Sequence, residues 1–348
     1  MTTVGQRLVA GLAARGVGTV FGIPGVHTVE LYRGLAGTAL CHVTPRHEQG
    51  AGFMADGYAR ASGRPGVAFV ITGPGLTNTL TPMAQARADS VPLLVVSSVN
   101  RSDTLGRGLG ELHELPDQHA LAAGVARRAV SLRQADELEP ALDAIFDGFA
   151  TERPGPAHLE VPLDLLGTPA PAGATPAEPA MPPAPDATAI AEATDRLSRA
   201  ARPVILAGGG AVRAEAALRA VAEALDAPVV QTVNARGLMH RHPLTVAASP
   251  SLDAVRALIA GADPVLAVGT ELGPTDYDMN ATGEMPEMAG LIRLDICAEQ
   301  LARRPAALPI RTETGAGLAA LAATLPRREA GDGAARAVAT REAALAGL

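Results

Sequence analysis

One acidic residue, Glu48, lies in a segment of the chain that is built almost entirely from small residues. With Thr44 as N-cap and Pro45 at the first helical position, the pattern predicts a helix that starts just before Glu48. On helical spacing the carboxylate shares its face with three small residues, Gly52, Ala55 and Ala59. Glycine costs about 1 kcal/mol relative to alanine inside a helix, which indicates that another backbone or a flat ligand comes close to this face.

The same segment also fits a purely structural interpretation, a tight contact between two helices with a solvated Glu48 at its rim. A position in the first helical turn favours the anion of Glu48, whereas burial among small residues disfavours it. These two effects act in opposite directions. The segment alone therefore leaves both interpretations open.

Composition excludes several classes of function. The chain has 348 residues, which favours about two domains, and its hydrophobic fraction of 47% supports sizeable cores. Aromatic residues make up only 2%, so we expect cores of alanine, valine and leucine. All 29 basic residues are arginine, the formal net charge is −7, and no basic run stands out. Nucleic acid is therefore not expected as a partner.

The cysteines and the N-terminus indicate the compartment. Cys41 and Cys297 are too few for a disulfide framework and lack metal-ligand spacing, so we expect each to be a small buried hydrophobic residue and no metal site. Arg7 and Arg15 interrupt the N-terminus, which argues against a signal peptide. No stretch approaches the roughly 20 apolar residues of a membrane span. We expect a cytoplasmic protein without a membrane partner.

Short β-branched runs alternate with helical patterns, which predicts α/β architecture with parallel sheets. In the first part, helices are expected over about 3–15, from 27, from the Glu48 segment, after the loop 72–78 and over 136–150. The strands expected there are 19–21, 41–43, 67–71, 93–97 and 157–161.

A proline- and alanine-rich stretch, 168–187, predicts a semi-rigid linker. Beyond it, the pattern predicts helices over 187–200 and up to 225, with strands over 204–207, 229–232, 265–268 and 291–295. Residues from 328 look like a helical tail. We therefore predict two separate parallel-sheet α/β domains, over 1–167 and 188–327.

Several motifs in register resemble the pyrimidine-binding domain of thiamine-diphosphate enzymes, and they lie at 21–25, 46–52, 57–60, 72–78, 89–93 and 158–164. The most similar group contains acetolactate synthase and related 2-oxo-acid decarboxylases. Within that group, residues 25–32 and 112–118 resemble the branch of 5-guanidino-2-oxopentanoate (2-ketoarginine) decarboxylase. The second half resembles the Rossmann-like central domain of the same family through residues 203–210, 234–237 and 268–270.

The resemblance implies a catalytic role for Glu48. The matching glutamate in the family hydrogen-bonds the aminopyrimidine of thiamine diphosphate and thereby promotes removal of the C2 proton, after which the cofactor attacks a 2-oxo acid. The resemblance also implies that Pro24, Gly25, Gly73 and Asn78 line the pyrimidine pocket. Considered alone, Asn78 could instead cap the following helix.

His113 marks a departure from the family pattern. Acetolactate synthases carry a Phe-Gln pair where this chain has Leu112-His113, on the substrate side of the cofactor. His113 could relay a proton near neutral pH. Three neighbouring acids would suit a cationic substrate such as a guanidino acid: Glu111, Glu114 and Asp117. The alternative is a solvated loop of charges.

Two glycine-rich segments are weak nucleotide signals. The loop 73–75 lacks the lysine and hydroxyl residue of a phosphate-binding loop. The run 208–210 has Arg213 where a third motif glycine is expected. Some family members bind FAD or ADP in the central domain; the weak pattern here favours an empty or purely structural domain over a nucleotide-binding module.

The family binds the diphosphate and Mg²⁺ through a third domain that opens with Gly-Asp-Gly. The chain's own match, 331–333, follows no apolar strand, so we interpret it as a fortuitous match in the tail. The diphosphate-binding domain is then expected on another chain or in a missing C-terminal part. The alternative is a non-catalytic scaffold or regulatory homologue. We also expect at least a homodimer that buries the face around Gly52 and Ala55.

Overall fold

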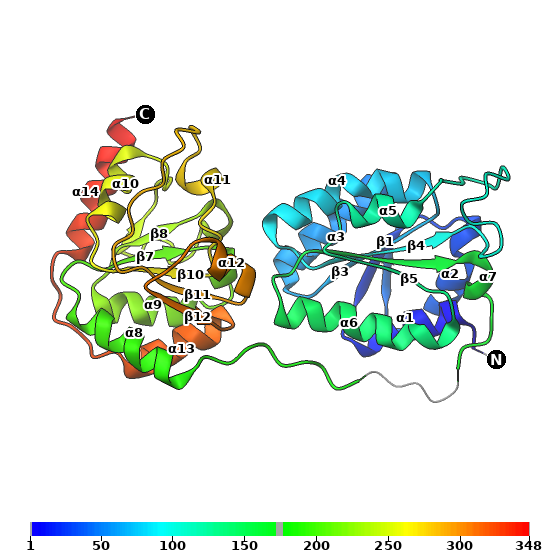
Figure 1. Ribbon diagram of the computed structural model, residues 1–348, viewed down its shortest axis with the longest axis horizontal. Helices are drawn as coiled ribbons and strands as arrows, with labels where there is room; N and C mark the ends of the chain where they lie inside the picture. Colours follow the sequence, from blue (N-terminus) through cyan, green and yellow to red (C-terminus); the bar gives the residue numbers. More distant parts are fainter. Residues whose placement is uncertain (1, 172–176, 348) are drawn as a thin grey trace. The chain divides into compact units, whose positions relative to one another are not determined.

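The computed structural model describes residues 2–171 and 177–347, and the chain divides into two compact units between residues 181 and 182. Within the described residues each unit holds one six-stranded sheet, and every strand pairing is parallel. Helices cover both faces of each sheet (Figure 1). The prediction of two parallel-sheet α/β domains is confirmed.

The first sheet has the strand order β2-β1-β3-β4-β6-β5. Its strands are β1 (Thr19–Gly22), β2 (Cys41–Val43), β3 (Gly66–Val70), β4 (Leu93–Val99), β5 (Arg128–Ser131) and β6 (Pro156–Pro162). The connecting helices are α1 (Val4–Ala14), η1 (Val26–Thr28), α2 (Val29–Leu35), α3 (Glu48–Ser62), α4 (Pro74–Asp89), α5 (Gln118–Ala123), η2 (Ala135–Glu137), α6 (Leu138–Thr151) and α7 (Leu163–Leu166).

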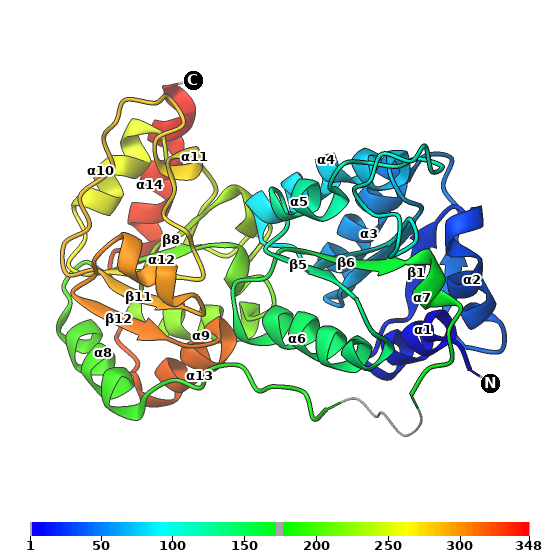
Figure 2. The same ribbon diagram turned by 45° about the vertical axis from the view of Figure 1, so that its right-hand side comes forward.

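The central strands β3, β4 and β6 are buried along their whole length, as expected for parallel strands covered on both faces. Apolar residues of α1, α2 and α6 pack on one face, and those of α3, α4 and α5 pack on the other (Figure 2). The second group is built largely from alanine, as the composition predicts.

The second sheet has the order β12-β11-β10-β7-β8-β9. Its strands are β7 (Val204–Ala207), β8 (Val229–Gln231), β9 (Thr245–Val246), β10 (Val265–Val268), β11 (Ile292–Asp295) and β12 (Leu308–Arg311). Its helices are α8 (Ala187–Arg199), η3 (Gly209–Ala211), α9 (Glu215–Leu225), η4 (Val233–Ala235), α10 (Asp253–Ala260), α11 (Pro274–Tyr277), α12 (Ala298–Arg303), α13 (Thr314–Thr324) and α14 (Gly333–Ala346).

Helix α14 covers the region expected as a helical tail, and its Ala337 and Ala344 lie in a core cluster of the second unit. The Gly-Asp-Gly run ahead of it forms a turn on Asp226, whose Oδ2 accepts the N–H groups of Gly331 and Gly333 at 2.9 Å each. A Cβ on Gly333 would lie 2.0 Å from the Asp226 carbonyl oxygen. The run therefore has a structural task in this chain.

Helix α3 starts at Glu48, four residues later than the predicted cap at Thr44. A residue before proline is disfavoured in the helical region, so Thr44-Pro45 prolongs the extended chain after β2. The cap is His47, whose ring Nδ1 accepts a hydrogen bond from the Gln49 N–H at 3.1 Å. Glu48 is thereby the first residue of the helix.

The small-residue face of α3 is buried inside the unit, so it cannot form the expected dimer surface. Ala55 is fully buried, and a Cβ on Gly52 would lie 2.3 Å from Cγ of Pro82 in α4. The close approach inferred from the glycines is thus a contact between α3 and α4. Gly57, by contrast, has no neighbour within 4 Å of an added Cβ.

The cysteines are not buried as expected. Cys41 is exposed and Cys297 is partly buried. Cys41 begins β2, a short strand at the edge of the first sheet, where few elements cover its side chain. In the part of the chain that is described, no helix is long and apolar enough to cross a membrane.

The described parts of the linker form hydrogen bonds with the unit that each of them adjoins. The N–H groups of Ala177 and Ala180 donate to Asp143 and Asp147 of α6. Further along, the Pro183 carbonyl accepts the Glu313 N–H at 2.9 Å. The remainder of the linker, residues 172–176, lies outside the described residues.

Candidate active site

The residues expected to bind the cofactor meet at the carboxyl edge of the first sheet, where ligands bind in open parallel sheets. Pro24 and Gly25 follow β1, Glu48 follows β2, and Gly73 follows β3. The segment 100–117, which contains His113, follows β4. The parallel topology therefore brings these distant segments to one edge.

Glu48 and Asn78 are in direct contact. The Asn78 Nδ2 donates to Glu48 Oε2 at 3.0 Å, and both side chains are half-buried. Among the residues that the structure describes, no hydrogen bond uses Glu48 Oε1. Asn78 lies inside α4, which is capped by Gly73, so it does not cap that helix. The pair leaves one carboxylate oxygen for a ligand.

Gly73 occupies a backbone conformation that only glycine adopts readily, with φ 60° and ψ −112°. A Cβ there would lie 2.3 Å from the His113 carbonyl oxygen. Glycine therefore allows the segment with His113 to pack directly against the loop that leads to Asn78.

A buried amide, Gln118, fixes this loop, and its role was not predicted from the sequence. Its Oε1 accepts the Gly73 N–H at 2.7 Å and the Thr72 hydroxyl at 2.9 Å. Its Nε2 donates to the Ser98 carbonyl and to Glu160 Oε2, at 3.0 and 2.9 Å. Because both ends of the amide are occupied, the Gly73 turn is tied to β4 and β6.

Gly25 lies in a second tight turn. A Cβ on it would lie 2.6 Å from Cγ2 of Ile71, and its N–H donates to the Thr28 hydroxyl at 3.1 Å. Pro24 beside it is exposed. Glycine therefore allows this turn to pack closely against Ile71, as Gly73 allows its loop to pack against the segment with His113.

The acidic stretch near His113 has mainly structural tasks. Glu114 accepts the N–H groups of Gly108, Gly110 and Glu111 and so orders its own loop. Asp117 caps α5 by accepting the Ala120 N–H at 2.8 Å. Of the three acids expected to suit a cationic substrate, only half-buried Glu111 has its carboxylate uncommitted within the described residues.

His27 is a buried residue at this edge of the sheet that was not among the predicted site residues. It lies in η1 directly after Gly25 and Val26, is 4% exposed, and its ring centroid lies 6.3 Å from that of exposed His113. Burial lowers the pKa of His27 below its usual value; His113 lowers it further, and Glu111 raises it. In the sequence, only the motif 25–32, which contains His27, pointed to this residue.

In the second unit, the glycine-rich run 208–210 lies where two backbone segments pack closely together. A Cβ on Gly208 would lie 2.2 Å from the Gly269 carbonyl oxygen, and one on Gly210 would lie 2.9 Å from the Gly269 Cα. These glycines thus allow the chain after β7 to pack against the chain after β10. Close backbone packing explains both glycines without a nucleotide.

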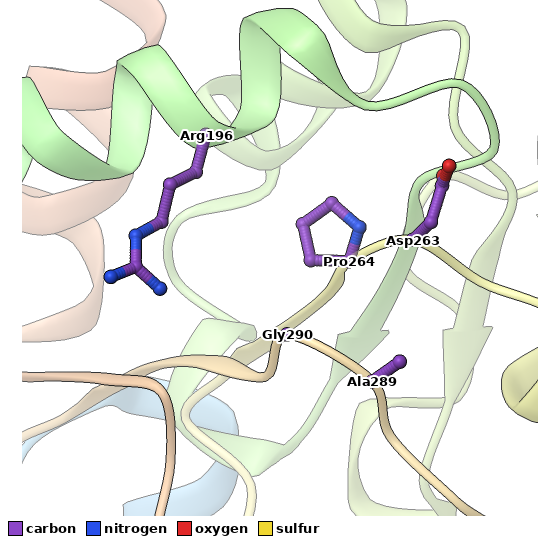
Figure 3. A pocket seen from close by; sticks show the side chains of 5 residues that line it. All are labelled: Arg196, Asp263, Pro264, Ala289 and Gly290. Carbon is purple, nitrogen blue, oxygen red and sulfur yellow. The ribbon is translucent and has the colours of Figure 1, made fainter.

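A cavity of about 380 Å³ in this unit is lined by Arg196, Asp263, Pro264, Ala289 and Gly290 (Figure 3). It lies where β10 and β11 begin, at the amino edge of the sheet. Arg196 is paired with Glu192 at 2.5 Å, and the Asp263 carboxylate accepts the N–H groups of Ala201 and Arg202. Its charged groups are thus already paired, and the cavity offers no reactive group.

A search of the described residues finds no group of three or more His, Cys, Asp and Glu side chains that could hold a metal ion. The cofactor-side residues do fit an aminopyrimidine ring. Glu48 supplies an acceptor oxygen that no described residue uses, and it lies at the same edge of the sheet as the turns at Gly25 and Gly73.

Comparisons with known proteins identify the family of both folded units. The model of the thiamine pyrophosphate enzyme N-terminal TPP binding domain matches residues 2–121, and that of the central domain matches residues 190–321. The chain is 48% identical over 332 residues to a protein of Pseudomonas aeruginosa described as a probable 2-ketoarginine decarboxylase, AruI. It is 32% identical over 339 residues to acetolactate synthase of Mycobacterium bovis.

These alignments cover 93% of this chain in both cases, but 58% and 53% of the relatives. The chain thus spans about half the length of the curated relatives that it matches. Two solved structures share the fold: a thiamin diphosphate-dependent enzyme from Mycobacterium smegmatis and the 4-hydroxybenzoylformate decarboxylase of Rhodococcus jostii RHA1. Their TM-scores are 0.82 and 0.80, each at 23% identity, covering 94% of this chain and 64% and 63% of theirs.

The two matched domain models together cover most of the chain, in the order in which the two folded units occur. The chain therefore belongs to the thiamine pyrophosphate enzyme family, of which it contains the N-terminal cofactor-binding domain and the central domain.

Proposed function

We propose that this chain supplies the pyrimidine-binding part of a thiamine-diphosphate-dependent enzyme that decarboxylates a 2-oxo acid. The observation that carries the proposal is the carboxylate of Glu48, held by Asn78 through one oxygen and open through the other. It lies at the carboxyl edge of the sheet, where the turns at Gly25 and Gly73 also lie.

Each residue then has a defined task toward the cofactor. Glu48 would hydrogen-bond the ring nitrogen of the aminopyrimidine through the oxygen that Asn78 does not use, and Asn78 keeps the carboxylate oriented. Gly25 and Gly73 shape the two turns at the same edge of the sheet, and Pro24 completes the first turn. Bound thiamine diphosphate supplies the electron sink for loss of CO₂ from the substrate. A diphosphate-binding domain, supplied by another chain or by a C-terminal part of the same enzyme, would hold Mg²⁺ and the diphosphate.

The substrate side favours a 2-oxo acid with a cationic end. The relative described as a 2-ketoarginine decarboxylase is 48% identical, well above the 32% of the acetolactate synthase. Glu111 is half-buried beside His113, and its carboxylate is not engaged elsewhere in the described chain. A guanidinium group is a natural partner for such a carboxylate because it forms bidentate hydrogen bonds.

Segments that follow the strands of the first sheet expose several large apolar side chains. Apart from Met181 in the linker, the exposed large apolar side chains described in the first unit all follow the carboxyl end of a strand. They are Val26, Val29, Phe53, Met54, Leu105, Leu109, Leu112 and Leu121. Exposed apolar side chains of this size are a feature of surfaces that another protein covers. We propose that a diphosphate-binding domain covers these side chains, which we name the apolar rim. The domain would come from another chain or from a C-terminal part of the same enzyme.

The test is release of CO₂ by the chain combined with a diphosphate-binding domain, thiamine diphosphate and Mg²⁺. The AruI relative supplies the domain, and 2-ketoarginine is compared with pyruvate. We expect turnover of 2-ketoarginine, its loss in Glu48→Gln, and its retention in Glu152→Gln, a control on exposed Glu152 after α6. Absence of turnover with either acid would support the scaffold interpretation instead.

A further inference from the structure

The buried amide of Gln118 has only one orientation that its neighbours allow. Its Oε1 meets two donors, the Gly73 N–H at 2.7 Å and the Thr72 hydroxyl at 2.9 Å. Its Nε2 faces acceptors, of which the nearest are Glu160 Oε2 at 2.9 Å and the Ser98 carbonyl at 3.0 Å. A flipped amide would set N–H against N–H, and oxygen against carboxylate oxygen. The surroundings therefore fix Oε1 toward Gly73.

Glu160 supplies the charge in this arrangement. The residue is 4% exposed, and in the described part of the chain its carboxylate takes part in no ion pair. Two neutral groups hold it, the Gln118 amide at Oε2 and the Ser131 hydroxyl, which donates to Oε1 at 2.7 Å. A buried carboxylate without a cationic partner is costly unless it is well hydrogen-bonded. The Gln118 amide therefore cannot turn without leaving this charge short of a donor.

The hold on Gly73 reaches the cofactor edge through α4. Gly73 is the N-cap of this helix and has φ 60° and ψ −112°. Asn78 lies in the same helix and donates to Glu48 Oε2 at 3.0 Å. A displaced Gly73 turn would therefore move the start of α4 and, with it, the donor that orients Glu48.

We propose that Gln118 and Glu160 are positioning residues of the candidate active site. The Glu160 charge fixes the direction of the Gln118 amide, and the amide oxygen holds the Gly73 turn. That turn keeps Asn78 against Glu48. The effect on the cofactor rests on the proposed function, whereas the hold on the turn is a property of the chain alone.

Hydrogen exchange of the Gly73 N–H, followed by NMR in the chain alone, tests this hold. Gln118→Met keeps the length of the side chain and removes both ends of the amide. Exchange at Gly73 should then quicken by roughly tenfold or more relative to the amides of β3. Equal quickening at Gly73 and in β3 would mean a general loss of stability and would overturn the positioning role.

Gln231→Met is the matched control for the loss of a buried amide. Gln231 lies in the second unit, is 6% exposed, and donates to the Leu238 carbonyl. Its substitution should leave exchange at Gly73 unchanged.

A charge exchange tests the pair itself. Gln118→Glu sets two carboxylates against each other, where Nε2 and Glu160 Oε2 now lie 2.9 Å apart, and they stay together only while they share a proton. The Gly73 N–H should therefore lose protection relative to β3 as pH rises. Adding Glu160→Gln puts a donor opposite the new carboxylate, so this dependence on pH should largely vanish. A double variant as sensitive to pH as Gln118→Glu would overturn the pairing.

Exchange of the C2 proton of thiamine diphosphate tests the consequence in the assembled enzyme, with a diphosphate-binding domain and Mg²⁺ present. At saturating cofactor, Gln118→Met should slow it by roughly 10- to 100-fold, because a misplacement of about 1 Å can cost about 100-fold. Gln231→Met should leave it unchanged. Circular dichroism checks folding, and the charge-exchange variants decide the case if Gln118→Met does not fold.

Failure of this inference and failure of the proposed function are distinguishable. Unchanged C2 exchange in Gln118→Met, together with slow exchange in Glu48→Gln, overturns the positioning role and leaves the proposed function intact. A parent protein that does not activate the cofactor contradicts the proposed function. Protection of the Gly73 N–H then still decides whether Gln118 and Glu160 hold the turn.

Discussion

At the scale of single residues, the sequence predicted some residues of the candidate site and missed others. Glu48 stood out because an acid among glycine and alanine is unusual, and the structure gives it a partner, Asn78. His27 and Gln118 did not stand out, because their environments depend on contacts with residues far away in the sequence. No local pattern records that Gln118 meets Gly73, 45 residues earlier.

The Asn78 amide should matter for orientation and little for folding. Asn78→Ala removes the donor to Glu48 Oε2 and should slow cofactor activation by roughly fivefold, because one hydrogen bond contributes about 1 kcal/mol. Asn78→Asp should be more damaging, since two carboxylates 3 Å apart cannot both ionise. Activity of the assembled enzyme provides the measurement. An Asn78→Asp variant as active as the parent would show that this contact does not orient Glu48.

His158 should make the first unit sensitive to acid. Burial, with a smaller contribution from His119, lowers the pKa of His158 to about 3. The unfolded chain takes up this proton near pH 6.5, whereas the folded chain does not until about pH 3. Stability from this group is therefore complete above pH 6.5 and falls by about 1.4 kcal/mol per unit between these values.

Urea unfolding between pH 5 and 7 measures this slope. His158→Gln, which can still hydrogen-bond Ser97, should flatten it because the residue no longer titrates. If the parent and the variant lose stability equally over this window, then His158 is not the group responsible.

At the scale of elements, the interior was easier to predict than the edges. Central strands such as β7 and β10 match their predicted bounds, because a strand buried on both faces is a continuous apolar run. The edge strands β5, β9 and β12 were missed. Two of them are only partly buried and the third has two residues, so they carry no continuous apolar pattern.

Two glycines of α3 should respond in opposite ways to the same substitution. Gly52→Ala places a methyl group 2.3 Å from the Pro82 ring and should destabilise the protein by about 1–3 kcal/mol. Gly57→Ala meets nothing within 4 Å and should stabilise it by about 0.5–1 kcal/mol through helix propensity. Thermal unfolding of both variants provides the comparison. Equal effects would mean that packing between α3 and α4 is not what requires Gly52.

At the scale of the whole molecule, the sequence predicted two α/β units but misplaced the surface for assembly. The face around Gly52 and Ala55 looked free because small residues suit close contact, and α4 already occupies it. The exposed residues of the same helix, Phe53 and Met54, belong to the apolar rim instead. Which face of α3 points outward depends on the packing of α4, and local sequence does not reveal it.

The apolar rim should control association. We expect at least a homodimer at micromolar concentration by light scattering, because the rim has no cover within its own unit. Exchanging both Phe53 and Met54 for serine should shift the chain toward monomer without lowering its thermal stability, since both side chains are already more than 40% exposed. Met279→Ser, at a side chain 61% exposed in the second unit, is the control. A dimer that persists in the double variant would place the interface elsewhere.

The central claim is that the Glu48 carboxylate activates thiamine diphosphate, and exchange of the cofactor's C2 proton measures this most directly. With a diphosphate-binding domain and Mg²⁺ present, exchange into heavy water is followed by quenched-flow NMR for the parent and for Glu48→Gln. Glutamine keeps the shape and the contact with Asn78 but cannot carry the negative charge. We predict that exchange falls by several orders of magnitude while the melting temperature hardly changes. Exchange as fast as in the parent, or a variant that unfolds, would contradict the account.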